Sequence, residues 1–155
     1  MAGGTMGVFY GAASLWQWKL TADEPGWGEW CAGAWNWREA LKLEGSTYVG
    51  LLGQVFNALP MADMVKDIEL GRGRQCVGVR GKFAVLYLPE GGGVSVNIDR
   101  VATYRLLDPR TGDGVSEGQI KPSAGWGTMM NCEHGRPAVW VLTFPDAYQH
   151  AAILL

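Results

Sequence analysis

The stretch RQCVGVRGKFAVLYLPEGGGVSVNID, residues 74–99, decides the fold of this chain. It contains an apolar run at Phe83–Leu88 and an alternating run at Val94–Ile98, separated by a proline, a glutamate and three glycines. Two such runs around a glycine-rich turn predict a β-hairpin. In the second run the two valines and the isoleucine share one face, which predicts one buried and one solvated side.

Short apolar runs continue on both sides of this stretch. The glycines and charged residues of Gly78–Lys82 predict a turn, so that Gln75–Val79 is a further strand. From Met64 onward we expect strands near Val65–Leu70, Gln75–Val79, Phe83–Leu88, Val94–Asp99, Ala102–Leu107, Met129–Cys132 and Ala138–Thr143. Short strands at close spacing, separated by turns that contain Gly, Pro and Asp, predict an antiparallel β-sandwich.

The N-terminal part has a different pattern. Residues 5–15, TMGVFYGAASL, are small and apolar without a polar face, which predicts a strand buried on both sides, as in a parallel sheet. Residues 19–37 form a long loop rich in tryptophan and glycine, and such loops are usually functional. One helical turn is expected at Trp37–Leu41, and the tail from Asp146 is either a short helix or a loose end.

One helix is predicted at residues 46–59, STYVGLLGQVFNAL. Its apolar residues recur at helical spacing, and Ser46 or Thr47 is the expected N-cap. Pro60 ends it. The glycines at positions 50 and 53 lower its intrinsic stability by about 1 kcal/mol each, and their small size favours close packing there.

The sequence thus divides at Pro60. Residues 1–62 are expected to form one strand-loop-helix unit, and residues 63–155 the β-sandwich. The fold class is mainly β. Because a parallel strand needs neighbours on both sides, a single βα unit cannot bury its own strand. Residues 1–62 therefore have the character of a piece of a larger domain.

The composition excludes several functional classes. The formal net charge is -2, with 48% hydrophobic and 18% charged residues, so nucleic acid and anionic membranes are not expected partners. The N-terminus has neither the charged nor the long apolar region of a signal peptide, so the chain as it stands is expected in the cytoplasm. The cysteines, Cys31, Cys76 and Cys132, contain no CxxC pair, so we expect free thiols and no metal or other cofactor. Pairing of Cys76 with Cys132 is the alternative.

Four segments resemble the C-terminal part of the apiosidase-like glycoside hydrolases: GVFYGAASLWQW, WREALKLEGSTYVGLLGQVFNALP, GKFAVLYLPEGGGVSVNID and YRLLDPRTGD. That family joins a TIM-barrel catalytic domain to a C-terminal β-sandwich that is often labelled a collagen-binding domain. The resemblance implies that residues 7–16 correspond to barrel strand eight, residues 46–59 to helix eight and residues 63–155 to the sandwich. The family's first seven βα units have no counterpart here, so its paired catalytic carboxylates cannot be assigned.

The same resemblance suggests where a sugar would bind. Loops after barrel strands build the active site, and Trp16 resembles the aromatic wall of the family's sugar subsite. The candidate substrate-binding residues are Tyr10, Trp16, Trp18, Trp27 and Trp30. The alternative is that these rings pack the loop, which we favour for Trp30 as well as for the tryptophans at 35 and 37.

The acidic residues of the loop, Asp23, Glu24 and Glu29, are expected to be solvated rather than catalytic. The turn Asp108–Gly112, DPRTG, is expected to be structural. Three functions remain. The first is a noncatalytic fragment of a glycoside-hydrolase-like protein, with a sandwich that stabilises the missing barrel portion or contacts polysaccharide. The others are a stand-alone carbohydrate-binding module and an assembly module whose N-terminal strand pairs with another chain, such as a second copy.

Overall fold

The computed structural model describes residues 10–16, 18–24, 35–57, 59–124 and 128–144. The helical elements are α1 (Ala13–Trp16), α2 (Trp37–Ala40), α3 (Glu44–Phe56) and the 3₁₀ turn η2 (Met61–Asp63). The strands are β1 (Val65–Lys66), β2 (Gln75–Val79), β3 (Phe83–Leu88), β4 (Gly91–Val96), β5 (Ala102–Leu107), β6 (Gly114–Ile120), β7 (Thr128–His134) and β8 (Ala138–Thr143).

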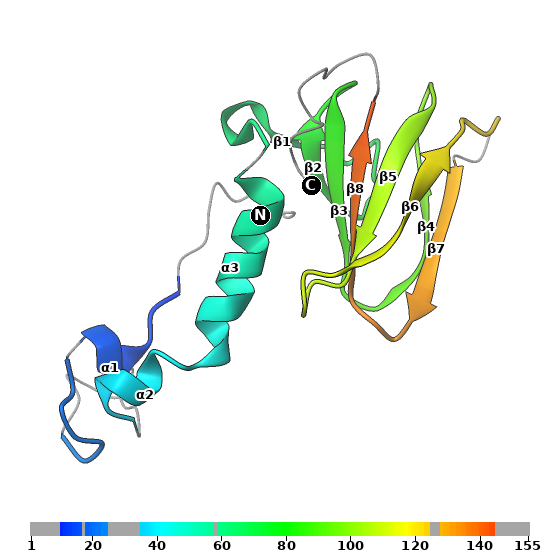
Figure 1. Ribbon diagram of the computed structural model, residues 1–155. Coiled ribbons are helices and arrows are strands. Elements are labelled where there is room, and N and C mark those ends of the chain that lie inside the picture. Colours follow the sequence, from blue (N-terminus) through cyan, green and yellow to red (C-terminus); the bar gives the residue numbers. More distant parts are fainter. Residues whose placement is uncertain (1–9, 17, 25–34, 58, 125–127, 145–155) are drawn as a thin grey trace.

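The strands form two antiparallel sheets (Figure 1). The larger sheet has the order β1-β2-β3-β8-β5-β6, and the smaller one pairs β4 with β7. Helix α3 lies along one face of the larger sheet, and the smaller sheet lies on the other. Helices α1 and α2 lie beyond the N-terminal end of α3, away from the strands (Figure 1). The predicted mainly β, antiparallel architecture is confirmed.

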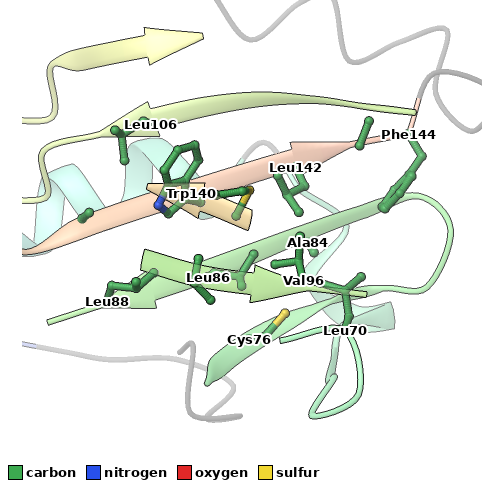
Figure 2. Close-up of a cluster of buried hydrophobic side chains, with 14 residues drawn as sticks. Leu70, Cys76, Ala84, Leu86, Leu88, Val96, Leu106, Trp140, Leu142 and Phe144 are labelled. Carbon is green, nitrogen blue, oxygen red and sulfur yellow. The ribbon is translucent and has the colours of Figure 1, made fainter. Parts of the chain in front are cut away.

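The main core fills the space between the two sheets (Figure 2). Leu86 of β3, Val96 of β4 and Leu142 of β8 have no exposed surface. Trp140 of β8 lies in the same core, with its ring 5.0 Å from that of Tyr104, and its indole N–H has no hydrogen-bond partner. All buried residues of this core lie between residues 70 and 144: Leu70, Cys76, Ala84, Leu86, Leu88, Val94, Val96, Ala102, Leu106, Met130, Ala138, Trp140, Leu142 and Phe144.

A second, smaller cluster lies on the opposite face of the larger sheet. Phe56, at the C-terminal end of α3, is 4% exposed and is clustered with Val77, Phe83 and Val85 of β2 and β3. Leu52, Val55 and Leu59 pack against this cluster from the same helical segment. Strand β3 is therefore buried on both faces, one against α3 and one against the smaller sheet. The predicted division of the chain into two domains, residues 1–62 and residues 63–155, stays a prediction. The contacts of Phe56 join these two parts of the chain.

The predicted hairpin between β3 and β4 is wrong. Strand β3 pairs with β2 and β8, whereas β4 pairs with β7 in the other sheet. The glycines at this point serve a different purpose, because a Cβ atom on Gly91 would lie 2.2 Å from the carbonyl oxygen of Glu133 and 2.3 Å from that of Arg136. The residue has a φ of 61°, which also favours glycine. The chain thus crosses from one sheet to the other and approaches β7 closely, and the core-facing valines of β4 are buried as predicted.

The remaining strand predictions have mixed outcomes. Strands β2, β3, β5 and β8 have the predicted bounds, and β7 extends beyond its predicted ends. Strand β1 stops after Lys66, because the side chain of Asp67 accepts a hydrogen bond from the backbone N–H of Leu70 (2.9 Å) and turns the chain. Strand β6 was not predicted, and its first six residues are exposed.

The strand predicted at residues 5–15 is wrong over the part that the structure describes. Residues 10–12 have no regular structure, and Ala13–Trp16 form α1. The backbone N–H groups of Leu15 and Trp16 both donate to the carbonyl of Ala12. A strand needs a neighbour that accepts its hydrogen bonds, and no described strand lies beside residues 10–12, so the chain makes local bonds instead. Residues 5–9 lie outside the described residues, as does the tail from residue 145.

The helix predicted at residues 46–59 exists but is shifted toward the N-terminus. The N-cap position is Leu43, without a side-chain cap, and the Ser46 hydroxyl donates to the Leu43 carbonyl (3.0 Å), so the predicted cap is wrong. Close packing at the glycines is also wrong, because a Cβ on Gly50 would meet nothing within 4 Å and one on Gly53 only the Asn57 side chain. The helical turn predicted at Trp37–Leu41 is confirmed as α2.

Candidate functional site

The aromatic residues expected to contact a sugar gather around α1 and α2. Tyr10, Trp16 and Trp18 are 39%, 52% and 64% exposed. Trp27 and Trp30 lie outside the described residues. Since large aromatic side chains are mostly buried in proteins, this exposure gives the N-terminal part an accessible aromatic surface, which we call the aromatic end.

Two of these rings pack directly on glycines. A Cβ on Gly11 would lie 2.3 Å from the Trp16 indole, and one on Gly45 would lie 2.3 Å from the Tyr10 ring. The indole therefore covers the backbone of Gly11, and the tyrosine ring covers the first turn of α3. A larger residue at either position would meet the ring, so the glycines leave the space in which these aromatic rings lie.

Trp18 packs against a residue of α2. Its ring meets that of Trp37 edge to face, with centroids 5.2 Å apart at 75°, and the Arg38 guanidinium lies 4.3 Å above the Trp37 ring. Helix α2, which carries Trp37, is closed by a capping box in which Asn36 accepts from the N–H groups of residues 38 and 39 while Glu39 accepts from that of Asn36. Trp37 thus packs, as predicted, whereas Trp35 is 46% exposed.

The described acidic residues of the loop, Asp23 and Glu24, make local hydrogen bonds. The Glu24 carboxylate accepts hydrogen bonds from the N–H groups of Leu20 and Thr21, both at 3.2 Å. Asp23 is exposed, and a hydrogen bond from the Thr21 side chain, together with a backbone hydrogen bond, lowers the pKa of its carboxyl group. A lowered pKa is the opposite of what a general acid needs, so Asp23 does not fit that role. Glu29 lies outside the described residues.

The DPRTG turn contacts α3. Asp108 accepts hydrogen bonds from the backbone and the side chain of Arg110, and these lower the pKa of its carboxyl group to about 2, the side-chain bond being the larger cause. Gly112 has a φ of 81°, and a Cβ there would lie 2.7 Å from the Leu51 side chain. The hydrogen bonds of Asp108 are therefore within the turn, as expected of a structural role. The turn also contacts α3, through Gly112 and Leu51. A groove of about 750 Å³ opens between α3 and the larger sheet, over β5, β6 and β8.

A second hollow, of about 450 Å³, lies where the connections at one end of the sandwich meet. We call it the polar cleft, and its polar lining includes Asp67, Glu69, Arg80, Asn97, Asp99 and Arg100. Sequence reasoning did not single out these residues. They lie in three separate turns and connections, and the distance between these segments along the sequence gives no sign that they meet in the fold.

The two cysteines among the described residues do not form a site, and Cys31 lies outside those residues. Cys76 is buried in β2 and Cys132 is half-buried in β7, and both are free. Burial raises the pKa of the Cys76 thiol to about 12, which keeps it protonated and unreactive. Within the described residues, no group of three or more His, Cys, Asp or Glu side chains is placed to hold a metal ion. No helix in that part of the chain combines the length and apolarity needed to cross a bilayer.

The comparisons with known proteins bear on both halves of the chain. Residues 1–63 match the family described as the apiosidase-like catalytic domain. The fold is similar to the crystal structure of a glycoside hydrolase family 5 protein from Bacteroides vulgatus ATCC 8482, with a TM-score of 0.66 and 14% identity, over 90% of this chain and 33% of that one. A structure described as a glycoside hydrolase gives a TM-score of 0.56 and 14% identity, over 82% of this chain and 31% of that one.

No curated protein sequence matches the chain. The chain spans about a third of the length of the two solved structures, and at 14% identity they establish the fold alone. The resemblance read from the sequence is thereby confirmed for residues 1–63, which match the apiosidase-like catalytic domain, and over 90% of its length the chain has a fold similar to part of the Bacteroides vulgatus structure.

Proposed function

We propose that this chain is a noncatalytic part of a glycoside-hydrolase-like protein, in which the β-sandwich braces the last helix of the apiosidase-like segment. One observation carries the proposal: Phe56, at the end of α3, is buried against Val77, Phe83 and Val85 of the sandwich. Helix α3 lies within the residues that match the catalytic-domain family, whereas the three partners lie outside them. The brace therefore acts across the boundary of the family match.

The physical need for a brace follows from the helix itself. Helix α3 has 13 residues and two interior glycines, Gly50 and Gly53. Helices of this length are marginal alone in water, and each glycine costs about 1 kcal/mol relative to alanine. Its stability must come from packing of its apolar face, and the sandwich supplies that packing at the C-terminal turns.

Hydrogen exchange of the whole chain tests the brace. The N–H groups of the last two turns of α3 are expected to exchange only through global unfolding, with the same free energy as those of Leu86 and its neighbours in β3. Nuclear magnetic resonance measures both in one sample. If the α3 groups exchange through a local opening, with a free energy far below that of β3, the helix gains little from the sandwich and the brace is refuted.

The absence of catalysis is proposed on separate grounds. Most glycoside hydrolases cleave the glycosidic bond with two carboxyl groups that flank it. Glu24 is occupied by backbone N–H groups, and the exposed Asp23 has a lowered pKa. The purified chain is expected to release no product from aryl glycosides or plant polysaccharides. Turnover that disappears when one of its own acids is replaced by the amide would contradict this.

A second candidate function is sugar contact at the aromatic end. Trp16 and Trp18 support it, because both indoles are more than half exposed and both are held by neighbouring residues. Flat aromatic faces pack well on the apolar faces of sugar rings. Assembly through the N-terminal strand stays a prediction. The part of that segment that the structure describes is not a strand, and residues 5–9 lie outside the described residues.

A further inference from the structure

The groove between α3 and the larger sheet, which we call the α3 groove, begins where the contacts of the helix with the sheet end. Val85 of β3 and Val141 of β8 are directly opposite each other in the strand register and face the same side of the sheet. Val85 belongs to the cluster beneath α3 and is 1% exposed. Val141 lines the groove and is only half-buried. The helix therefore covers one of two neighbouring valines fully and leaves the other partly open.

The helix itself contributes apolar side chains to the same groove. Leu51 and Val55 of α3 line it, and both are half-buried. Together with Val141 they form an apolar strip along one side of the groove. Because the burial of apolar surface is the main favourable term in folding, a segment that covers this strip would be stabilised there.

The other side of the groove is polar. Arg105 of β5 and Glu117 of β6 are opposite each other in the strand register, and both line it together with Gln119. A segment that fits the groove has apolar side chains toward α3 and β8 and needs no net charge. It can keep polar side chains toward β6 and water.

The end of β8 places the following chain at one end of the α3 groove. Thr143 and Phe144 both line the groove. The backbone N–H of Phe144 donates to the Lys82 carbonyl (2.9 Å), and its side chain is 2% exposed beside the guanidinium of Arg100. Figure 2 shows Phe144 at the end of the main core. Residue 145 therefore leaves the sheet from a fixed point beside the groove.

The chain after this point is long enough to cover the groove. The groove extends along β5 from Thr103, opposite Thr143, to Leu107, opposite Val139, which is four residue steps or about 13 Å. Residues 145–155 number eleven and would span about 16 Å as a helix and up to about 36 Å when extended. Their first two residues, a proline and an aspartate, are of the types that favour turns. A reversal there would lead the chain back along β8.

The sequence of this segment has the character that the groove requires. Residues 145–155 read PDAYQHAAILL, so that polar residues at 149 and 150 precede five apolar ones. The two charges nearest to the groove in sequence, on Lys82 and Asp146, lie at the end where the chain would turn. A segment tethered at the groove has an effective concentration in the millimolar range, so contacts of modest strength are sufficient to hold it.

We propose that residues 147–155 fold back over the α3 groove, with their apolar end against α3 and β8. The side chains in contact are Ile153 and Leu154 of the segment and Leu51, Val55 and Val141 of the groove. The segment then covers the side of α3 that the sandwich leaves open and keeps this apolar surface from other chains. The proposal rests on the brace only for the position of α3 beside the sheet.

The test is the detection of methyl–methyl contacts in the whole chain by nuclear magnetic resonance, with the methyl groups of Ile, Leu and Val isotope-labelled. Cross-peaks are expected between Ile153 or Leu154 and Val141 or Val55. The cross-peak between Val85 and Val141, which are neighbours in the register, is the internal reference. If the reference is observed and the segment gives no cross-peak to the groove, the proposal is overturned.

A mixture of differently labelled copies distinguishes the two sources of such a contact. Cross-peaks within one copy support the proposal. Cross-peaks that arise only between copies would mean that the groove is occupied by a second chain, and they would overturn it.

A double variant provides an independent measurement. Ile153→Asp combined with Leu154→Asp places two carboxylates in an apolar strip, which is unfavourable, so the cross-peaks should be lost and the Val141 methyl signals should shift. Leu41→Asp combined with Ile68→Asp is the matched control, because these side chains are 56% and 57% exposed and lie outside the groove. It should leave the Val141 signals unchanged.

Equal shifts in the two double variants would overturn the proposal, because they would not depend on the segment. Hydrogen exchange in the last two turns of α3 tests the brace separately. The brace can therefore hold while the segment proves to lie elsewhere, and a failure of the brace would appear in α3 itself.

Discussion

Replacing Phe56 with alanine is expected to lower the free energy of unfolding by about 3–5 kcal/mol, the usual cost of truncating a buried phenylalanine. The side chain is 4% exposed and fills the centre of the cluster between α3 and the larger sheet. The loss combines the transfer of the ring from water with the cavity that remains. Urea unfolding followed by circular dichroism measures it, and α3 should become the first element to exchange its amide hydrogens.

Tyr48→Ala is the matched control on the same helix. This ring is 47% exposed and lies outside the cluster, with its hydroxyl bonded to Glu44. Surface substitutions usually change stability by less than about half a kcal/mol, and loss of this exposed bond adds little. Equal costs for the two variants would mean that α3 derives no particular stability from the sandwich, and the brace would lose its support.

Leu86→Ala is expected to cost about 2–5 kcal/mol, through the core between the two sheets. Leu86 has no exposed surface and lies at the centre of β3, opposite Cys76 of β2 and Trp140 of β8 in the strand register. Neighbours on both sides limit how far the structure can relax into the cavity. Chemical denaturation measures the change in midpoint.

Val115→Ala on the edge strand β6 is the control for this variant, because its side chain is 60% exposed. We expect it to change stability by less than about half a kcal/mol. A cost for Leu86→Ala in that same small range would mean that the side chain does not face the core, and the register of β3 would be wrong.

The sequence correctly predicted those strands whose own residues strongly favour the extended conformation. Phe83–Leu88 and Ala138–Thr143 are β-branched, aromatic and apolar runs with clear turns at their ends, and both have the predicted bounds. Strand β6 was missed because GVSEGQI has two glycines and an exposed face, and only its pairing with β5 makes it a strand. Edge strands of this kind carry no core pattern.

The partner of a strand is decided by the whole fold. The glycines at 91–93 suggested a hairpin, yet the same residues let β4 approach β7 in the other sheet. The N-terminal strand failed for a related reason, since a pattern without a partner cannot form a sheet. At the site, the aromatic residues could be recognised from the composition, whereas the polar cleft combines residues from connections that are distant in the sequence and has no local signature.

The position of β8 has a consequence for how the chain matures during synthesis. The strands β2 and β3 form one local hairpin and β5 and β6 another, but β8, the last of the strands that the structure describes, lies between β3 and β5. Until it leaves the ribosome, the two hairpins have no partner for the edges that will become the middle of the sheet. Such unpaired edges attract strands of other chains. The nascent protein is thus most exposed to misassembly just before β8 is available, and a chain that stops short of Ala138 would remain in that state.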